Sequence, residues 1–178
     1  MADFNKILDS GDYEHGIINV VIEIPMGSNH KIEWNRHKAC FCLDRVDPLI
    51  FSKPCNYGFI PQALDEDGDE LDALVLTSQP IPTGICLKAR ILGVMKFLDS
   101  GEVDDKIICV PVDDRESGNR YKTLDDIPEA LLTHIKFHFN HYKDRGENSE
   151  TEVQSFGDKK EAKQVVHDAI LRWYREIK

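Results

Sequence analysis

The first two-thirds of the chain consists of short apolar runs separated by polar and turn-forming residues. The runs are rich in β-branched residues, with some aromatic ones, and they recur at short spacing. They occupy residues 16–25, 31–35, 39–43, 73–77, 85–97 and 107–112. Many short strands at near-regular spacing predict a β-barrel or a β-sandwich. Gly93 lies inside the longest run and indicates a bend or a bulge there.

The last third of the chain changes to a helical period. Pro128 is a favourable first-turn residue, and the apolar residues that follow it fall on one helical stripe: Leu132, Ile135, Phe139 and Tyr142. A second stripe follows Lys159 and comprises Ala162, Val165, Val166, Ala169, Ile170 and Trp173. Strands followed by two helices are typical of an α+β fold, which here is mainly β. Since we see no repeat or linker, we expect residues 1–178 to form a single domain.

The composition argues against several classes of protein. The chain has 178 residues, of which 41% are hydrophobic and 30% charged, and its net charge is −10. This acidic balance argues against a nucleic acid or an anionic membrane bound through a basic surface. No apolar run resembles a signal sequence or a membrane span. The five cysteines include no C-x-x-C pair, which favours reduced, buried thiols in a cytoplasmic protein.

The stretch Leu64–Leu74, LDEDGDELDAL, crowds six carboxylates into eight positions between leucines. Two carboxylates roughly 6 Å apart repel each other by about 2–3 kcal/mol at an effective dielectric constant near 20. An EF-hand starting at Asp65 is excluded, because its sixth position is not glycine and its twelfth is not glutamate. Two interpretations remain. The stretch is a solvated acidic turn, or Asp67, Asp69 and Asp72 stand at a strand mouth and hold Mg²⁺ or Mn²⁺.

A second acidic cluster, DSGEVDDK, spans residues 99–106 and joins two predicted strands. Its Asp, Ser and Gly residues favour a hairpin turn. The same loop carries Asp99, Asp104 and Asp105, followed directly by Lys106. Carboxylates here could hold a metal ion on one side while the lysine binds a phosphate on the other.

The remaining candidates are scattered, and each taken alone is more often structural than functional. They are Lys31, Glu33, Arg45, Tyr57, Tyr142 and Lys143. His134, His138 and His141 share one helical face, but the glutamate of an H-E-x-x-H zinc motif is replaced by Ile135. A polar helix face or a subunit contact is therefore favoured over a zinc site.

Taken in order, these segments resemble the family I soluble inorganic pyrophosphatases. The segments are VIEIP, KIE, DR, PCNYGFIP, DGDELDAL, DSGEVDDK and HYKD, which together run from Val21 to Asp144. The core signature of that family is D-G-D-x-hydrophobic-D, which stands here at residues 67–72. Any one segment alone is weak, whereas seven in order are highly specific.

The resemblance implies a fold and a function. The fold is a small closed OB-like β-barrel with two C-terminal helices packed on it. The function is hydrolysis of inorganic diphosphate to two phosphates with three or four Mg²⁺ ions, for which Mn²⁺ or other divalent ions can substitute. It also implies a homo-oligomer, with a hexamer favoured. Metal ions can lower the pKa of an attacking water and take up phosphate charge, which would explain the crowded carboxylates.

The resemblance also implies roles for individual residues. The metal ligands would be Asp67, Asp72, Asp99 and Asp104, with Glu23 bordering the metal cluster. Asp69 would position or deprotonate the attacking water. Phosphate oxygens would be held by Lys31, Arg45, Tyr57, Lys106, Tyr142 and Lys143, and Glu33 would support them. We further expect Leu64, Leu71 and Leu74 to anchor the acidic stretch, and Asp65, Glu66 and Glu70 to face solvent.

Two departures from the family pattern affect substrate binding. Lys53 stands where many relatives carry tyrosine, and no lysine follows Lys143 until Lys159, where many relatives have one soon after the HYK segment. The missing lysine predicts somewhat weaker substrate binding. Two other classes of function stay open: a non-catalytic divalent-metal-binding protein on the same scaffold, and an OB-type nucleic-acid-binding module. Phosphate-binding residues disfavour the first class, and the net charge disfavours the second.

Overall fold

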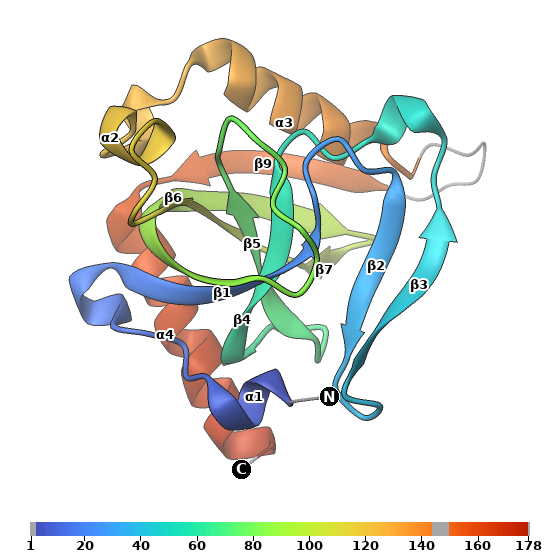
Figure 1. The fold of residues 1–178 in the computed structure, drawn as a ribbon, viewed down its shortest axis with the longest axis vertical. Helices are drawn as coiled ribbons and strands as arrows, with labels where there is room; N and C mark the ends of the chain where they lie inside the picture. The colour runs from blue at the N-terminus through green and yellow to red at the C-terminus, as the bar shows by residue number, and fades with distance from the viewer. Residues whose placement is uncertain (1–2, 144–149, 178) are drawn as a thin grey trace.

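The computed structural model describes residues 3–143 and 150–177 and shows a ring of strands covered by helices (Figure 1). The strands are β1 (Ile17–Ile24), β2 (His30–Asn35), β3 (Cys40–Val46), β4 (Asn56–Leu64), β5 (Glu70–Val75), β6 (Cys86–Asp99), β7 (Glu102–Val103), β8 (Lys106–Pro111) and β9 (Thr151–Gly157). The α-helices are α1 (Phe4–Ile7), α2 (Ser117–Arg120), α3 (Glu129–His141) and α4 (Lys159–Glu176). Short 3₁₀ turns are η1 (Tyr13–His15), η2 (Leu49–Phe51) and η3 (Leu124–Asp126).

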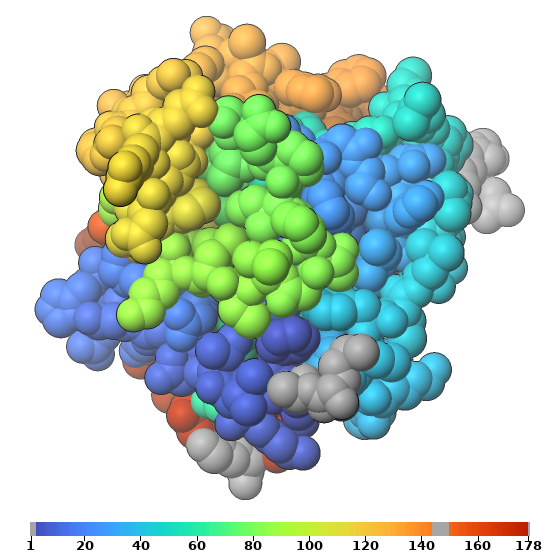
Figure 2. All heavy atoms as spheres, viewed as in Figure 1, coloured from blue at the N-terminus to red at the C-terminus, as the bar shows by residue number. Residues whose placement is uncertain are grey.

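Hydrogen bonding closes the sheet on itself. Strand β1 pairs with β4 and with β6, β5 lies between β4 and β8, and β8 returns to β6. The β5–β8 pair is parallel, whereas the other pairs in the ring are antiparallel. The expected mainly β, OB-like architecture is therefore confirmed as a closed ring of strands. Strands β2 and β3 form a separate hairpin beside it, along one side of the molecule in Figure 2.

Alternation of side chains along β5 separates two hydrophobic cores. Leu71, Ala73 and Val75 belong to a core that also contains Ala162 and Val166 of α4. The side chains on the other face of β5, which include Leu74, pack in a second core under α3. Asp72 therefore lies on the α3 side of the strand. Leu64, Leu71 and Leu74 are all buried, as expected of residues that anchor the acidic stretch.

Both C-terminal helices are confirmed, but β4 and β9 were not predicted from the pattern. Gly58 and Pro61 interrupt the apolar run of β4. A Cβ on Gly58 would lie 2.0 Å from the Val21 carbonyl oxygen, so the close approach of β1 and β4 requires glycine. Strand β9 is mostly polar, and hydrogen bonding to β6 creates it. Gly93 lies at a register shift in β6, as predicted.

Among the described residues, no helix is long and apolar enough to cross a membrane. The cysteines are free, but the expectation of buried thiols holds only for Cys55 and Cys109. Cys40 and Cys42 are partly exposed on β3, and Cys86 is exposed. The missing-lysine region begins with residues 144–149, which lie outside the described residues.

Candidate active site

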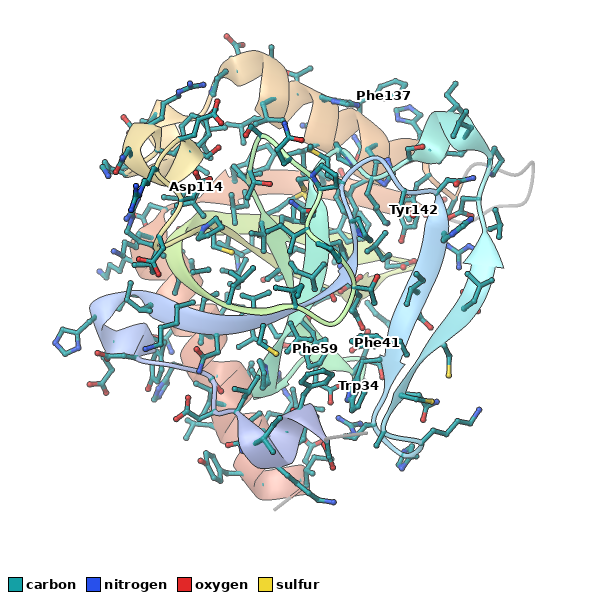
Figure 3. All side chains as sticks on the ribbon, in the orientation of Figure 1. Trp34, Phe41, Phe59, Asp114, Phe137 and Tyr142 are labelled. Carbon is teal, nitrogen blue, oxygen red and sulfur yellow. The ribbon has the colours of Figure 1, made fainter. Side chains whose placement is uncertain are left out.

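A cavity of about 280 Å³ lies where the β2–β3 hairpin, the ring and the end of α3 meet. Every residue for which the resemblance implies a role lines it, except Arg45 and Lys106. The polar lining residues are Glu23, Lys31, Glu33, Asn35, Lys53, Tyr57, Asp67, Asp69, Glu70, Asp72, Asp99, Asp104, Tyr142 and Lys143. In Figure 3, Tyr142 lies at the end of α3 near the hairpin, whereas Phe137 lies on the outer side of the helix. Segments far apart in the sequence thus meet at one cavity.

The acidic stretch forms the turn between β4 and β5. The Asp65 amide donates to the Asp69 carbonyl oxygen at 2.8 Å, and Gly68 has φ +91°, which an L side chain rarely adopts. The Asp69 amide donates to Asp67 Oδ1 at 3.0 Å, which orients the Asp67 carboxylate at the tip of the turn. Burial raises the pKa of Asp69, and the charge of Asp67 adds to the effect. The turn therefore places like charges beside Asp72 of β5.

Lys106 is buried beneath the cavity and joins the two acidic segments. Parallel pairing of β5 and β8 puts it opposite Asp72. Its Nζ donates to Asp72 Oδ2 at 2.6 Å and to Asp104 Oδ1 at 2.8 Å, and it is 1% exposed. Burial opposes its charge, but the two carboxylates outweigh burial and raise the pKa of the ammonium. Lys106 therefore stays protonated and offsets the repulsion between Asp72 and Asp104.

Tyr57 completes this arrangement from β4. Its hydroxyl donates to Asp72 Oδ2, the oxygen that Lys106 also contacts. Burial raises the pKa of Tyr57 well above its usual value, and the charge of Asp72 acts in the same direction. The phenol therefore remains a neutral hydrogen-bond donor beside the carboxylates.

The second acidic cluster divides between two faces of the sheet. Asp99 ends β6, and its Oδ2 pairs with the Lys143 ammonium and lies 3.5 Å from the Tyr142 hydroxyl. Asp104 faces the cavity. Asp105 instead pairs with Lys96 at 2.6 Å and accepts the Phe97 amide at 3.2 Å. The predicted hairpin turn is confirmed, and Asp105 has a structural role in it.

The β2–β3 hairpin supplies a second group of cations. Lys31 lies opposite Arg45 in the strand register and pairs with Glu33 at 2.5 Å and with Asp44 at 3.5 Å. Arg45 pairs with Asp44 at 2.8 Å and with Asp47 at 2.9 Å. Lys31 and Glu33 reach the cavity, whereas Arg45 does not line it.

Glu23 is the buried carboxylate at the end of β1. Its Oε1 accepts the Trp34 amide at 2.6 Å, which links the ring to the hairpin. Burial raises the pKa of Glu23 well above its ordinary value, and the charge of Asp72 raises it further. A cation between Glu23 and Asp72 would offset their repulsion and favour the charged form of Glu23.

Three expectations about individual side chains are wrong. Asp65 and Glu70 do not face solvent; they are 5% and 8% exposed. Glu70 accepts Asn5 Nδ2 at 2.7 Å and lies 3.3 Å from Arg36 Nη1, so partners distant in sequence bury it. His138 is not on a polar face: it is buried, stacks on Tyr142, and burial lowers its pKa to about 3. Glu66 is exposed, as predicted.

The donor set fits hard divalent cations. Carboxylate oxygens predominate, and the nitrogen and sulfur ligands that favour zinc are few around the cavity. Among the described residues, no three His, Cys, Asp or Glu side chains are already grouped closely enough to hold a metal ion. The Lys106 ammonium holds one oxygen each of Asp72 and Asp104. The other oxygen of each carboxylate has no hydrogen bond within the described part of the chain and is available to a metal ion.

Metal-free protein is expected to lose stability as the pH rises from 6.5 to 8. Burial raises the pKa of Asp65 from 3.8 to about 8, so the folded state keeps a proton that the unfolded state releases. Each such group lowers the free energy of unfolding by up to about 1.4 kcal/mol per pH unit. Urea unfolding in EDTA across this range measures the slope.

This pH window isolates the carboxylates. Below pH 6.5, the lowered pKa of His138 makes the free energy of unfolding increase with pH, which is opposite to the effect of the carboxylates. Above pH 8, the lowered pKa of Lys53 has the same opposite effect. Asp65→Asn should reduce the slope, and saturating Mg²⁺ should also reduce it, because bound cations favour the charged forms of nearby carboxylates. A metal-free stability that rises across the window, or an unchanged slope in Asp65→Asn, would contradict this account.

Comparison with known proteins agrees with the geometry. The family model described as inorganic pyrophosphatase matches residues 20–174. The chain is 64% identical to an inorganic pyrophosphatase of Neisseria meningitidis over 99% of both chains, and 61% identical to one of Haemophilus influenzae over 97% of this chain and 98% of the relative. A crystal structure of an inorganic pyrophosphatase from Neisseria gonorrhoeae superimposes with a TM-score of 0.94 at 63% identity, covering 97% of this chain and 99% of that one. The chain belongs to the inorganic pyrophosphatase family.

Proposed function

We propose that this protein hydrolyses inorganic diphosphate to two phosphates with divalent metal ions, as an inorganic diphosphatase. The observation that carries the proposal is the lining of one cavity. Carboxylates of β5 and of the two acidic turns meet lysines and tyrosines there. Carboxylates alone would suit a metal-binding protein, whereas the added lysines and phenols suit a phosphate ligand.

Asp67, Asp72, Asp99 and Asp104 would hold the metal ions, with Glu23 at the border. The family depends on divalent metal, and we propose Mg²⁺ in three or four sites, which Mn²⁺ could also fill. The bound cations would offset the negative charge of the phosphoryl oxygens and lower the pKa of a bound water molecule. The raised pKa values of Glu23 and Asp104, caused first by burial, support cation binding, because a cation favours their charged forms.

The cations and phenols around the cavity would hold the substrate. Lys31, Tyr57, Tyr142 and Lys143 line it, so their polar atoms can contact phosphate oxygens directly. Lys106 lies beneath the lining and would act through Asp72 and Asp104, or donate upward when a metal ion draws those carboxylates away. Arg45 would reach the substrate only if its pairs with Asp44 and Asp47 rearrange, and Glu33 would orient Lys31.

Asp69 would receive the proton of the attacking water. The water oxygen forms a bond to one phosphorus, the bond from that phosphorus to the bridging oxygen breaks, and the second phosphate leaves with the electron pair. Asp69 stands at the turn tip, exposed to the cavity. Its pKa is raised by burial and by Asp67, which makes it a better base than an ordinary aspartate.

Further properties of the protein follow from the same proposal. We propose that residues 1–178 work as one domain, that the protein acts in the cytoplasm, and that it assembles as a homo-oligomer, with a hexamer favoured. Analytical ultracentrifugation measures the subunit number directly. The comparisons support inorganic pyrophosphatase and lend no support to a non-catalytic metal-binding protein or a nucleic-acid-binding module.

Phosphate release from diphosphate tests the proposed function. The protein is expected to release two phosphates per diphosphate with Mg²⁺ present, and release should fall to background after chelation with EDTA and return on adding Mg²⁺. The affinity for Mg²⁺ is measured by calorimetry on the same protein. Tight Mg²⁺ binding without phosphate release would instead identify a metal-binding protein that has lost the reaction.

A further inference from the structure

Lys53 is a buried lysine whose direction is fixed by its backbone. It follows η2 and precedes β4, and it is 8% exposed. Its amide donates to the Ser28 carbonyl oxygen, and the Gly27 amide donates to the Lys53 carbonyl oxygen, both at 2.9 Å. These two bonds tie the segment to the turn between β1 and β2. The side chain therefore enters the cavity from a rigid support.

Three aromatic rings surround the Lys53 ammonium. Its Nζ lies 4.9 Å from the ring centroid of Tyr57, 5.0 Å from that of Tyr142 and 5.4 Å from that of Phe139. Ring faces attract cations, so this cage of Tyr57, Phe139 and Tyr142 offsets part of the cost of burying the Lys53 ammonium. Because aromatic rings attract the ammonium without accepting conventional hydrogen bonds from it, its N–H donors stay available to an anionic ligand.

Lys53 differs from the other cations near the cavity in its partners. Lys31, Lys106 and Lys143 each pair with carboxylates. In residues 3–143 and 150–177, Lys53 forms no ion pair with a carboxylate. Burial, together with the nearby charge of Lys106, lowers the pKa of Lys53 to about 8. A buried cation beside another cation is costly unless an anion accompanies it.

We propose that Lys53 is a substrate-binding residue whose caged ammonium contacts a phosphate oxygen of diphosphate. The inference rests on the proposed function and deepens it by assigning a further substrate-binding cation to the same cavity. Tyr57 and Tyr142 both form the cage and line the cavity. The rings that hold the Lys53 ammonium therefore also lie beside the space that the substrate would occupy. Lys53 would therefore contribute to binding of the diphosphate more than to the chemical step.

Lys53→Met tests the proposal, because methionine retains most of the stem and removes the charge. The Kd for methylenediphosphonate, a diphosphate analogue that resists hydrolysis, is measured by calorimetry with Mg²⁺ and should rise about tenfold. The KM for diphosphate should rise by a similar factor, while kcat changes less than about threefold. Lys53→Arg keeps the charge and should stay within about threefold of wild type in Kd and KM. Lys160→Met removes an exposed lysine of α4 and should change neither.

Thermal unfolding separates substrate binding from packing. Without ligand, Lys53→Met should unfold at the same or a higher temperature, since a buried charge is removed from an aromatic cage. Lys53→Gln replaces it if the methionine variant does not fold. Unchanged Kd and KM in a folded neutral variant, or equal losses in the neutral variant and Lys53→Arg, would overturn the proposal. Absence of phosphate release by wild type itself would instead refute the proposed function.

Discussion

Asp69→Asn is expected to lower kcat for diphosphate by about 10²–10⁴-fold while Mg²⁺ affinity stays within about threefold of wild type. General-base catalysis contributes rate factors of about this size. Asparagine keeps the shape of the turn tip but cannot accept the proton of the attacking water. Removal of one negative charge beside Asp67 also relieves repulsion, so the turn should remain folded. Single-turnover phosphate release and Mg²⁺ calorimetry measure the two quantities separately.

Glu66→Gln is the matched control for this variant. Glu66 lies in the same turn, is exposed, and contacts Arg172 at 3.4 Å and not the cavity. Its neutral variant should keep kcat within about twofold of wild type. If Asp69→Asn retained full turnover, or if it lost Mg²⁺ affinity as strongly as turnover, Asp69 would not be the base and would have to be assigned to metal binding.

Asp72→Asn is expected to weaken Mg²⁺ binding at least tenfold and to destabilise the fold. Asp72 Oδ2 accepts both the buried Lys106 ammonium and the Tyr57 hydroxyl. Removing one partner of a buried ion pair costs about 3–5 kcal/mol, and the lower end applies because Asp104 still holds Lys106. A loss of about 3 kcal/mol lowers the Tm by about 6–12 °C in a chain of this size. Relief of repulsion with Glu23 is smaller, because that pair has no direct contact.

Asp105→Asn separates metal binding from stability. Asp105 is buried, whereas Asp72 is half-buried, and Asp105 pairs with Lys96 and does not line the cavity. Its neutral variant should lose stability without losing Mg²⁺ affinity. In the double variant Asp72→Asn/Lys106→Met, part of the lost stability should return because the uncompensated cation is gone. Equal Mg²⁺ affinity in Asp72→Asn and wild type would remove Asp72 from the ligand set.

Local pattern was sufficient to predict much of the fold and of the site. The helices after Pro128 and Lys159 and most ring strands follow from hydrophobic period, which depends on near neighbours. Strand β4 was missed because Gly58 and Pro61 break its pattern, and β9 because polar residues form it. Both strands exist through hydrogen bonds to distant strands, which no local pattern reports.

The carboxylates and cations were identified as candidates from the sequence, but their partners were not. Asp65 and Glu70 were expected to face solvent, but both are buried. Asn5 and Arg36, far away in the chain, bury Glu70 instead. Lys53 departs from the family pattern, and only the structure surrounds it with three rings, which come from β4, from α3 and from Tyr142 directly after α3. Such partners are set by tertiary packing.

By itself, the sequence determined the family, the order of most elements and the identity of the charged groups, because residue type and spacing carry that information. The tertiary structure decided which charges compensate one another. Parallel pairing of β5 with β8 sets Lys106 opposite Asp72, and this contact turns two repelling acidic segments into one site. Electrostatic energy depends on the distance between charges and on their burial. Both are set by the folded chain and not by the spacing of the charged residues along the sequence.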